Sequence, residues 1–208
     1  METCVLFCAG MFSGLAAPLH PTDRIVAVDG GLAHVQALGL RPHEILGDFD
    51  SLGYIPENAA VFPKEKDDTD TMLALRRGLE AGYRRFVLYG ALDGKRPDHA
   101  VANFQSLLFL ARHGAAGYLV GKEQIVTAVH NGCVSFPAGS QGTVSLFALG
   151  GDARGVTLRG LYYPLEDGVL ESSVPLGVSN HFTGQPASVR VTSGSLLILY
   201  DRKNGLSD

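Results

Sequence analysis

Short apolar runs alternate with helical patterns over about the first 120 residues of the chain. The apolar runs have the composition of β-strands and occupy residues 4–10, 24–30, 44–50, 85–90 and 117–121. Between several of them, apolar residues recur at helical spacing, over residues 31–39, 69–82 and 98–114. Strands that alternate with helices favour a mostly parallel, Rossmann-like sheet that helices cover on both faces.

The helical pattern over residues 69–82 carries its own start and stop signals. Met72, Leu75 and Leu79 recur at the spacing of one helical face. Thr69 is a suitable N-cap and Gly82 a suitable end of the helix. We therefore predict a helix whose first turn carries the acidic residues of this segment.

The pattern changes after about residue 123. Short β-type runs then follow one another, with Gly, Ser and Pro between them and without helical periodicity. This rhythm is typical of a small antiparallel sandwich or barrel. We expect two domains, an α/β domain over residues 1–123 and an all-β sandwich over residues 124–208.

Composition narrows the classes of function. Of the 208 residues, 46% are hydrophobic and 18% are charged, as in an ordinary globular protein. The net charge is −4 and there is no basic block, so a nucleic acid is not an expected partner. No apolar run approaches the roughly 18 residues that span a bilayer, so no membrane association is expected either. The beginning of the chain does not resemble a signal peptide, and three cysteines favour the reducing cytoplasm.

The acidic clusters follow the predicted strands of the α/β domain, at the edge of the sheet where ligands bind in this class of fold. Asp29, Gly30 and Gly31 end one strand and open a helix. The glycines would let a ligand approach the backbone, and the N–H groups at a helix start suit a phosphate. As a lone motif this signal is weak, because a tight turn between strand and helix explains the same residues more often than a ligand site does.

The segment GDFD, residues 47–50, gives a stronger signal. Side chains at positions i and i+2 of an extended segment point the same way, so Asp48 and Asp50 can converge. Two close carboxylates repel each other unless a cation or a proton lies between them, and their oxygens suit magnesium. A solvated turn would explain either aspartate alone but not the apolar Phe49 between them.

Two further segments add charge to this edge. Asp67, Asp68 and Asp70 lie at the start of the second predicted helix, where capping alone would also explain them. The segment 90–103 supplies Lys95 and Arg96, which suit phosphate. Neither a Ser-His-Asp set nor a phosphate-binding loop of the G-x-x-x-x-G-K-[ST] type is found. The set favours metal-assisted phosphoryl-type transfer without a covalent intermediate.

Six segments in this order resemble the thiamine pyrophosphokinase family in its bacterial type: VDGG (28–31), GDFDS (47–51), KDDTD (66–70), GKRPDHAVAN (94–103), GLYYPL (160–165) and LGVSNHF (176–182). The resemblance implies an α/β domain, a β-sandwich and a homodimer. Each active site would lie between the α/β domain of one subunit and the β-domain of the other. The implied reaction transfers the pyrophosphoryl group of ATP to the hydroxyl of thiamine, giving thiamine diphosphate and AMP.

The resemblance also implies roles for individual residues. Asp48, Asp50 and Asp70 match the ligands of Mg²⁺, and Arg96 and Asp98 match a pair close to the phosphates and the reacting hydroxyl. The residues implied in substrate binding are Asp29, Gly30, Gly31, Lys66, Thr69, Asn103, Tyr163, Ser179 and Asn180. An aromatic ring would attract the cationic thiazolium of thiamine, and Ser and Asn can bond its aminopyrimidine.

Two other functions fit the same acidic edge. A metal-dependent phosphohydrolase or nucleotidyltransferase would turn over nucleotides without thiamine. A thiamine or nucleotide sensor would bind its ligands without forming AMP. A converging set of metal-binding carboxylates argues against the sensor, which has no need of one.

Overall fold

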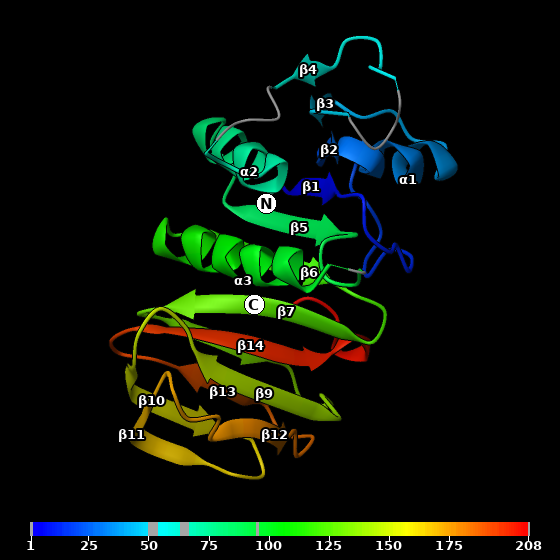
Figure 1. Cartoon of the computed structure of the whole chain (residues 1–208). Helices are drawn as coiled ribbons and strands as arrows, with labels where there is room; N and C mark the ends of the chain where they lie inside the picture. Colours follow the sequence, from blue (N-terminus) through cyan, green and yellow to red (C-terminus); the bar gives the residue numbers. More distant parts are fainter. Residues whose placement is uncertain (1, 50–53, 63–66, 95, 208) are drawn as a thin grey trace. The chain divides into compact units, whose positions relative to one another are not determined.

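The computed structural model describes residues 2–49, 54–62, 67–94 and 96–207, so Asp50, Lys66 and Lys95 lie outside the described residues. The chain forms two compact units (Figure 1). Unit 1 consists of Met1–Ser106 with Leu119–Lys122, and unit 2 of Leu107–Tyr118 with Glu123–Asp208. The expected domain boundary at residue 123 stays a prediction.

Unit 1 is built on a parallel sheet. Its strands are β1 (Cys4–Phe7), β2 (Arg24–Val28), β3 (Glu44–Gly47), β4 (Ala60–Val61) and β5 (Arg85–Tyr89). They follow the order β5-β1-β2-β3-β4, and each neighbouring pair is parallel. The last residues of β6 (Ala116–Val120) also belong to unit 1. All four residues of β1 are buried, which explains its unbroken apolar run.

The predicted helices form close to the expected positions. The short 3-10 helix η1 (Asp29–Gly31) leads into α1 (Leu32–Ala37), and the other two are α2 (Asp70–Glu80) and α3 (Pro97–Arg112). Helix α1 contacts β1 and β2, while α2 contacts β2 and β3. Among the described residues, no helix combines the length and the apolar character needed to cross a bilayer.

Helix α2 has the caps that its sequence predicts. The Thr69 side chain accepts a hydrogen bond from the N–H of Met72 at 3.1 Å, and Gly82 adopts φ +93° just beyond the helix. Leu75 is fully buried, and a Cβ on Gly78 would lie 2.5 Å from the ring of Phe86 in β5. Close packing of α2 on the sheet therefore fixes where its first turn, and with it Asp70, lies.

Unit 2 holds two antiparallel sheets. One has the order β12-β9-β14-β7 and the other β11-β10-β13-β8. The rings of Phe136 and Tyr200, one from each sheet, lie 4.9 Å apart, so the sheets pack face to face. The fold predicted from the sequence, an α/β domain followed by an antiparallel β-sandwich, is confirmed. The bounds in unit 2 are β7 (Gln124–His130), β8 (Cys133–Phe136), β9 (Thr143–Ala148), β10 (Ala153–Arg159), β11 (Leu165–Leu170), β12 (Gly177–His181), β13 (Ala187–Arg190), β14 (Ser195–Asp201) and η2 (Arg202–Asn204).

Candidate active site

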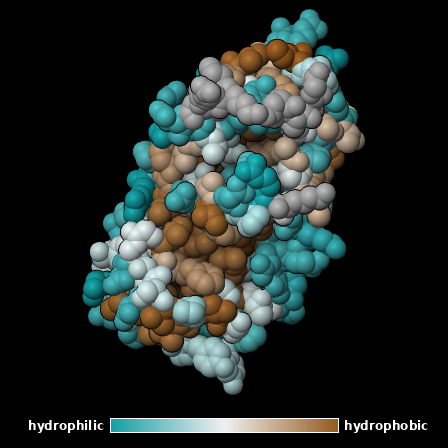
Figure 2. All heavy atoms as spheres, viewed as in Figure 1, coloured by the Kyte–Doolittle hydropathy of each residue, from teal (hydrophilic) through white to brown (hydrophobic). Residues whose placement is uncertain are grey.

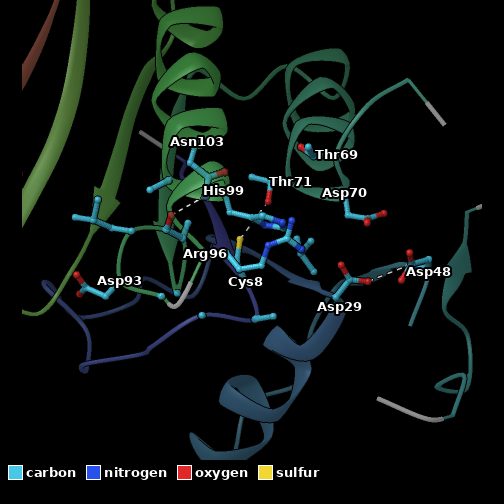
Figure 3. A pocket seen from close by; sticks show the side chains of 18 of the residues that line it. Cys8, Asp29, Asp48, Thr69, Asp70, Thr71, Asp93, Arg96, His99 and Asn103 are labelled. Atoms are coloured by element: carbon cyan, nitrogen blue, oxygen red, sulfur yellow. Dashed lines mark hydrogen bonds between the residues drawn. The ribbon is translucent and has the colours of Figure 1, made fainter. Parts of the chain in front are cut away.

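A cleft of about 430 Å³ opens in unit 1 where its parallel strands end (Figure 3). The loops after β1, β2, β3 and β5 line it, together with the first turns of α2 and α3. Since all these strands are parallel, their carboxyl ends share one edge of the sheet, as expected for a binding site in this class of fold.

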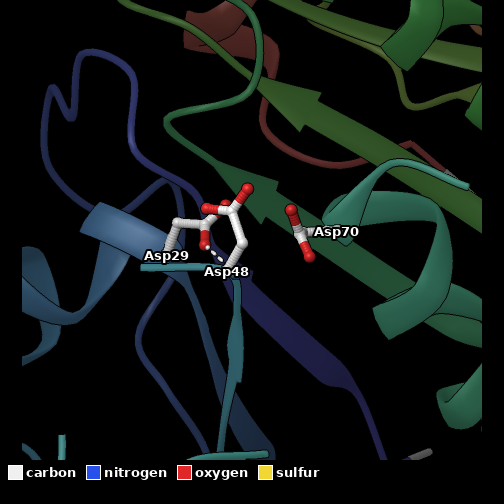
Figure 4. A group of neighbouring side chains, drawn as sticks. All are labelled: Asp29, Asp48 and Asp70. Atoms are coloured by element: carbon white, nitrogen blue, oxygen red, sulfur yellow. Dashed lines mark hydrogen bonds between the residues drawn. The ribbon is translucent and has the colours of Figure 1, made fainter. Parts of the chain in front are cut away.

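Three carboxylates converge in this cleft: Asp29 after β2, Asp48 after β3 and Asp70 at the start of α2 (Figure 4). One oxygen from each lies within 4.8 Å of the others, and all three residues are half-buried. The sequence singled out Asp48 and Asp70 as metal ligands but assigned Asp29 only to substrate binding. The third expected ligand, Asp50, lies outside the described residues and stays a prediction.

Asp29 is held in place by the segment that carries Asp48. Its Oδ1 accepts hydrogen bonds from the N–H groups of Asp48 at 3.1 Å and Phe49 at 3.4 Å. A Cβ at Gly47, whose φ is +154°, would lie 1.8 Å from the same oxygen. Glycine at position 47 therefore allows the two acidic segments to meet.

The packing of Phe49 explains why an apolar residue follows Asp48. Its side chain is only 3% exposed, and its backbone adopts φ +56°, which is uncommon for a bulky residue. The buried ring anchors the turn after β3 while the N–H of Phe49 points at Asp29. The apolar residue is thus part of the packing that positions the carboxylates.

The electrostatics of the cluster suit a cation. Burial and, next to it, the neighbouring charge of Asp70 raise the pKa of Asp29 to about 6, against the lowering effect of the Phe49 N–H. Carboxylate oxygens at this spacing are the ligands that magnesium prefers in proteins. A divalent ion would relieve the repulsion, so the donor set fits such an ion.

Arg96 and Asp98 form an ion pair at the start of α3. The guanidinium Nε of Arg96 lies 3.2 Å from Asp98 Oδ1, and the side chains are 67% and 61% exposed. The hydrogen bond from Arg96 holds the pKa of Asp98 below its usual range. Arg96 lines the cleft together with the carboxylates, so the expected phosphate-binding residue is close to the expected metal ligands.

Asn103 and Thr69 also line the cleft, but both side chains bond to the protein's own backbone. Asn103 is buried, and its Nδ2 donates to the carbonyl oxygen of Ala91 at 2.6 Å. Thr69 caps α2. These contacts hold the loops around the cleft, and direct contact of either residue with a substrate stays a prediction.

Gly30 and Gly31 form η1 with Asp29. A Cβ on Gly31 would lie 1.8 Å from the carbonyl oxygen of Phe7, so this glycine permits close packing of η1 on the end of β1. The tight turn that the sequence also allowed is therefore present. Contact of either glycine with a phosphate stays a prediction.

In unit 2, Asn180 fixes the backbone of Tyr163. Its Oδ1 accepts from the Tyr163 N–H at 3.0 Å, and its Nδ2 donates to the Tyr163 carbonyl oxygen at 2.8 Å. Asn180 is 4% exposed, whereas Tyr163 is 60% exposed and packs edge-on against Tyr162. Asn180 and Tyr163, both implied in substrate binding, thus form one unit in which a buried amide presents an aromatic ring.

Ser179 lies at an irregular point of β12. Its φ is +60°, and the register of β12 with β9 shifts between Gly177 and Asn180. The N–H of Ser179 donates to Ser145 Oγ at 3.0 Å, and the residue is exposed. Such a bulge redirects side chains and is frequent beside functional sites.

Sequence reasoning missed several residues of the cleft. Cys8 and Asp93 line it and were given no role in binding, and Asp29 was not expected in the metal cluster. The position of each just after a strand of a parallel sheet was the available signal. That signal marks every residue at this edge, so it could not select among them.

Comparison with known proteins gives independent support for the family resemblance of the sequence. The family model described as thiamin pyrophosphokinase, catalytic domain, matches residues 18–118. A second model, described as thiamin pyrophosphokinase, vitamin B1 binding domain, matches residues 134–197. The two matches cover most of the chain, one in each part that the sequence distinguishes.

Relatives and solved structures agree with these matches. The curated thiamine pyrophosphokinase of Bacillus subtilis (strain 168) is 27% identical over 190 residues, covering 84% of this chain and 85% of that protein. The crystal structure of thiamine pyrophosphokinase from Bacillus subtilis matches with a TM-score of 0.86 at 22% identity, over 96% of this chain and 99% of that one. The one from Geobacillus thermodenitrificans matches with a TM-score of 0.79 at 24% identity, over 97% of both chains. These structures share the fold of this chain.

Proposed function

Because the chain belongs to the thiamin pyrophosphokinase family and is an enzyme of that kind, we propose that it transfers the pyrophosphoryl group of ATP to the hydroxyl of thiamine. The products are thiamine diphosphate and AMP. The observation that carries the proposal is the convergence of Asp29, Asp48 and Asp70 in a cleft that Arg96 also lines. Metal and phosphate ligands in one cleft suit an in-line transfer without a covalent intermediate.

Asp29, Asp48 and Asp70 are the residues that would hold Mg²⁺, with Asp50 as a further predicted ligand. When bound, the ion would neutralise charge on the phosphates of ATP and help to align them. Asp29 would then stay ionised at neutral pH, because a nearby positive charge lowers the pKa of a carboxyl group.

Arg96 binds the phosphates of ATP in this proposal, since its guanidinium can contact two oxygens at once. Its pair with Asp98 is largely exposed, so a phosphate can replace this partner without separating a buried ion pair. Asp98 has a lowered pKa, which makes it a weak base. We therefore assign Asp98 to orienting the hydroxyl of thiamine by accepting its hydrogen bond.

Cys8 supports direct transfer. It lines the cleft and could in principle serve as a nucleophile, but burial raises the pKa of its thiol to about 12. The thiol therefore stays protonated at neutral pH, and the thiolate is the nucleophilic form of cysteine. Transfer without a covalent enzyme intermediate agrees with this chemistry.

Thiamine binding is assigned to unit 2. The exposed ring of Tyr163 would attract the thiazolium cation, and Asn180 would keep that ring in place through its two hydrogen bonds to the Tyr163 backbone. Ser179 is exposed and has a hydroxyl that can bond the aminopyrimidine. Lys66, Thr69, Gly30, Gly31 and Asn103 remain proposed contributors on the ATP side.

We further propose a homodimer in which each site combines the α/β domain of one subunit with the β-domain of its partner. Strand β12 is at the end of its sheet, and apolar side chains are exposed on and around it, with Leu176 68% exposed and Val178 43% exposed. Figure 2 shows apolar side chains at the surface over unit 2. An edge strand with exposed apolar residues is a natural place for contact with a second chain.

The cytoplasm is the proposed location. All three cysteines are free; Cys4 is buried in β1 and Cys8 is buried just after that strand. A reducing compartment suits free thiols of this kind.

The proposal is tested by separating the products after purified protein is incubated with thiamine, ATP and Mg²⁺, with a matched reaction in EDTA. We expect thiamine diphosphate and AMP in equal amounts, and neither product in EDTA. ADP or phosphate without thiamine diphosphate would instead identify a phosphohydrolase. Bound thiamine without any turnover would identify a sensor.

A further inference from the structure

The segment between β5 and α3 rests directly on the loop that follows β1. The N–H of Gly10 donates to the carbonyl oxygen of Gly90 at 2.8 Å. A Cβ on Gly90 would lie 2.3 Å from the carbonyl oxygen of Cys8, and one on Gly10 would lie 2.5 Å from that of Gly90. The two loops therefore pack backbone to backbone, next to the cleft that both of them line.

Asp93 ties the same segment to two neighbouring loops. Its carbonyl oxygen accepts from the N–H of Met11 at 2.9 Å, and its carboxylate Oδ2 accepts from the N–H of Lys122 at 2.6 Å. A Cβ on Gly121 would lie 2.8 Å from that Oδ2, so the glycine lets the carboxylate reach the turn after β6. One residue thus joins the loops that follow β1, β5 and β6.

The carboxylate of Asp93 is directed away from the metal cluster. Within the described part of the chain, the carboxylates that converge within 4.8 Å are those of Asp29, Asp48 and Asp70. Figure 3 shows Asp93 across the cleft from Asp48 and Asp70. Asp93 is therefore not expected to bind the metal or to touch the reacting atoms.

The segment is also held two residues earlier, where Asn103 donates to the carbonyl oxygen of Ala91 at 2.6 Å. With Ala91 and Asp93 both fixed, the chain that leads to Arg96 starts from a defined place. We propose that Asp93 is a positioning residue for the transfer reaction: it holds the β5–α3 segment so that Arg96 and Asp98 meet the phosphates and the hydroxyl in reactive geometry. The role rests on the proposed function, and it matters because displacement of such groups by about 1 Å can cost about 100-fold in rate.

The test compares Asp93→Ala, Asp93→Asn and Asp23→Ala in the Mg²⁺-dependent synthesis of thiamine diphosphate. Asparagine keeps an acceptor oxygen for the Lys122 N–H, whereas alanine removes it. Asp23 is the matched control, because its carboxylate also accepts backbone N–H groups, from His20 at 2.7 Å and Thr3 at 3.3 Å. It precedes β2, at the edge of the sheet opposite the cleft.

We expect Asp93→Ala to lower kcat by about 10- to 100-fold, while the KM for thiamine changes by less than about 3-fold. Asp93→Asn should keep kcat within about 3-fold of the wild type, as should Asp23→Ala. Amide hydrogen exchange of peptides covering residues 90–104 should be faster in Asp93→Ala only.

Three results would overturn the positioning role: an unchanged kcat in Asp93→Ala, an equal loss in Asp93→Asn, or the same loss in Asp23→Ala. Failure of the proposed function is a separate and earlier result. Wild-type protein that makes no thiamine diphosphate would overturn that function, and the role of Asp93 with it, before any variant is compared.

Discussion

At the scale of single residues, backbone strain accompanies the carboxylates of the site. Asp29 and Phe49 adopt φ of +48° and +56°, and each such conformation costs about 1–3 kcal/mol. The surroundings impose both, because Phe49 is buried and its N–H bonds to Asp29. The strained backbone at Asp29 and Phe49 keeps the carboxylates of Asp29 and Asp48 close together. Such an arrangement is useful only if a cation compensates the two negative charges.

Asp29→Asn should raise the free energy of unfolding of the metal-free protein by about 1 kcal/mol at pH 7, after allowance for partial exposure. The pKa of Asp29 is raised from 3.8 to about 6, so ionisation destabilises the fold as pH rises through this range. The gain should therefore disappear below about pH 4. Urea unfolding in EDTA at both pH values measures it.

The same substitution should lower turnover by at least about 100-fold and remove the stabilisation that Mg²⁺ gives the wild type. Asp48→Asn is the matched variant, since Asp48 belongs to the same cluster. Thermal unfolding with and without Mg²⁺ gives the second measurement. Equal Mg²⁺-induced shifts in the wild type and Asp29→Asn would contradict the assignment of Asp29 as a ligand.

Residue type indicated which groups could bind a metal or a phosphate, but not where they point. Contact of Asn103 and Asn180 with substrates stays a prediction, and in the folded chain both side chains donate to backbone carbonyl groups of the protein. An amide can bond a ligand or a loop equally well, and only the packed chain decides which partner lies within reach.

At the scale of elements, a half-buried carboxylate links β2, β3 and α2. Glu44 accepts from Arg24 at 2.8 Å and from Arg77 at 2.6 Å, and its side chain is 12% exposed. Burial would raise the pKa of Glu44, but the two hydrogen bonds outweigh it and lower the pKa. The network joins the strand that leads to Asp48 with the helix that begins at Asp70.

Glu44→Gln should cost about 1–2 kcal/mol of stability at pH 7. Because the pKa in the folded protein is below the usual 4.5, this stabilisation is present above that value and is lost as pH falls through the folded pKa. Urea unfolding at pH 7 and pH 3 measures the difference, which should shrink at the lower pH.

Glu166→Gln provides the control, since Glu166 and its partner Arg159 are 74% and 71% exposed. Such a surface pair is worth little, so we expect a change of less than about 0.5 kcal/mol. A cost for Glu44→Gln no larger than for Glu166→Gln would show that the network does not stabilise unit 1.

Elements with complete local signals were the most predictable. Thr69 and Gly82 mark the start and the end of α2 as expected, because an N-cap and a helix-ending glycine act within a few residues. The two-residue strand β4 was not predicted, since so short an edge strand depends on pairing with β3 and carries no periodic pattern of its own.

At the scale of the whole molecule, the proposed sites require two chains. The carboxylate cluster belongs to unit 1 and Tyr163 to unit 2. If each site combines these units from different subunits, a dimer can have one intact site even when each chain carries a defect.

Mixing Asp48→Asn with Tyr163→Ala after joint refolding should restore activity that neither variant has alone. About half of the dimers would be mixed and each would carry one intact site, so we expect about a quarter of the wild-type activity. Product formation, with size-exclusion chromatography to establish the dimer, measures this. No recovery in a mixed dimer would mean that each site is built within one subunit.

Apart from the short strand β4, the sequence by itself determined the alternation of strands and helices in the α/β domain, the change to antiparallel structure, and the edge at which the acidic residues gather. These follow from local periodicity and from the rule that parallel strands end on one edge. The tertiary structure alone decided that Asp29 completes the cluster with Asp48 and Asp70, and that Asp93 turns away from it. The reason is physical: spacing fixes directions only between near neighbours. Asp29 and Asp48 are 19 positions apart, and they converge with Asp70 through the φ of Asp29 and Phe49, the missing side chain of Gly47 and the packing of α2 on the sheet.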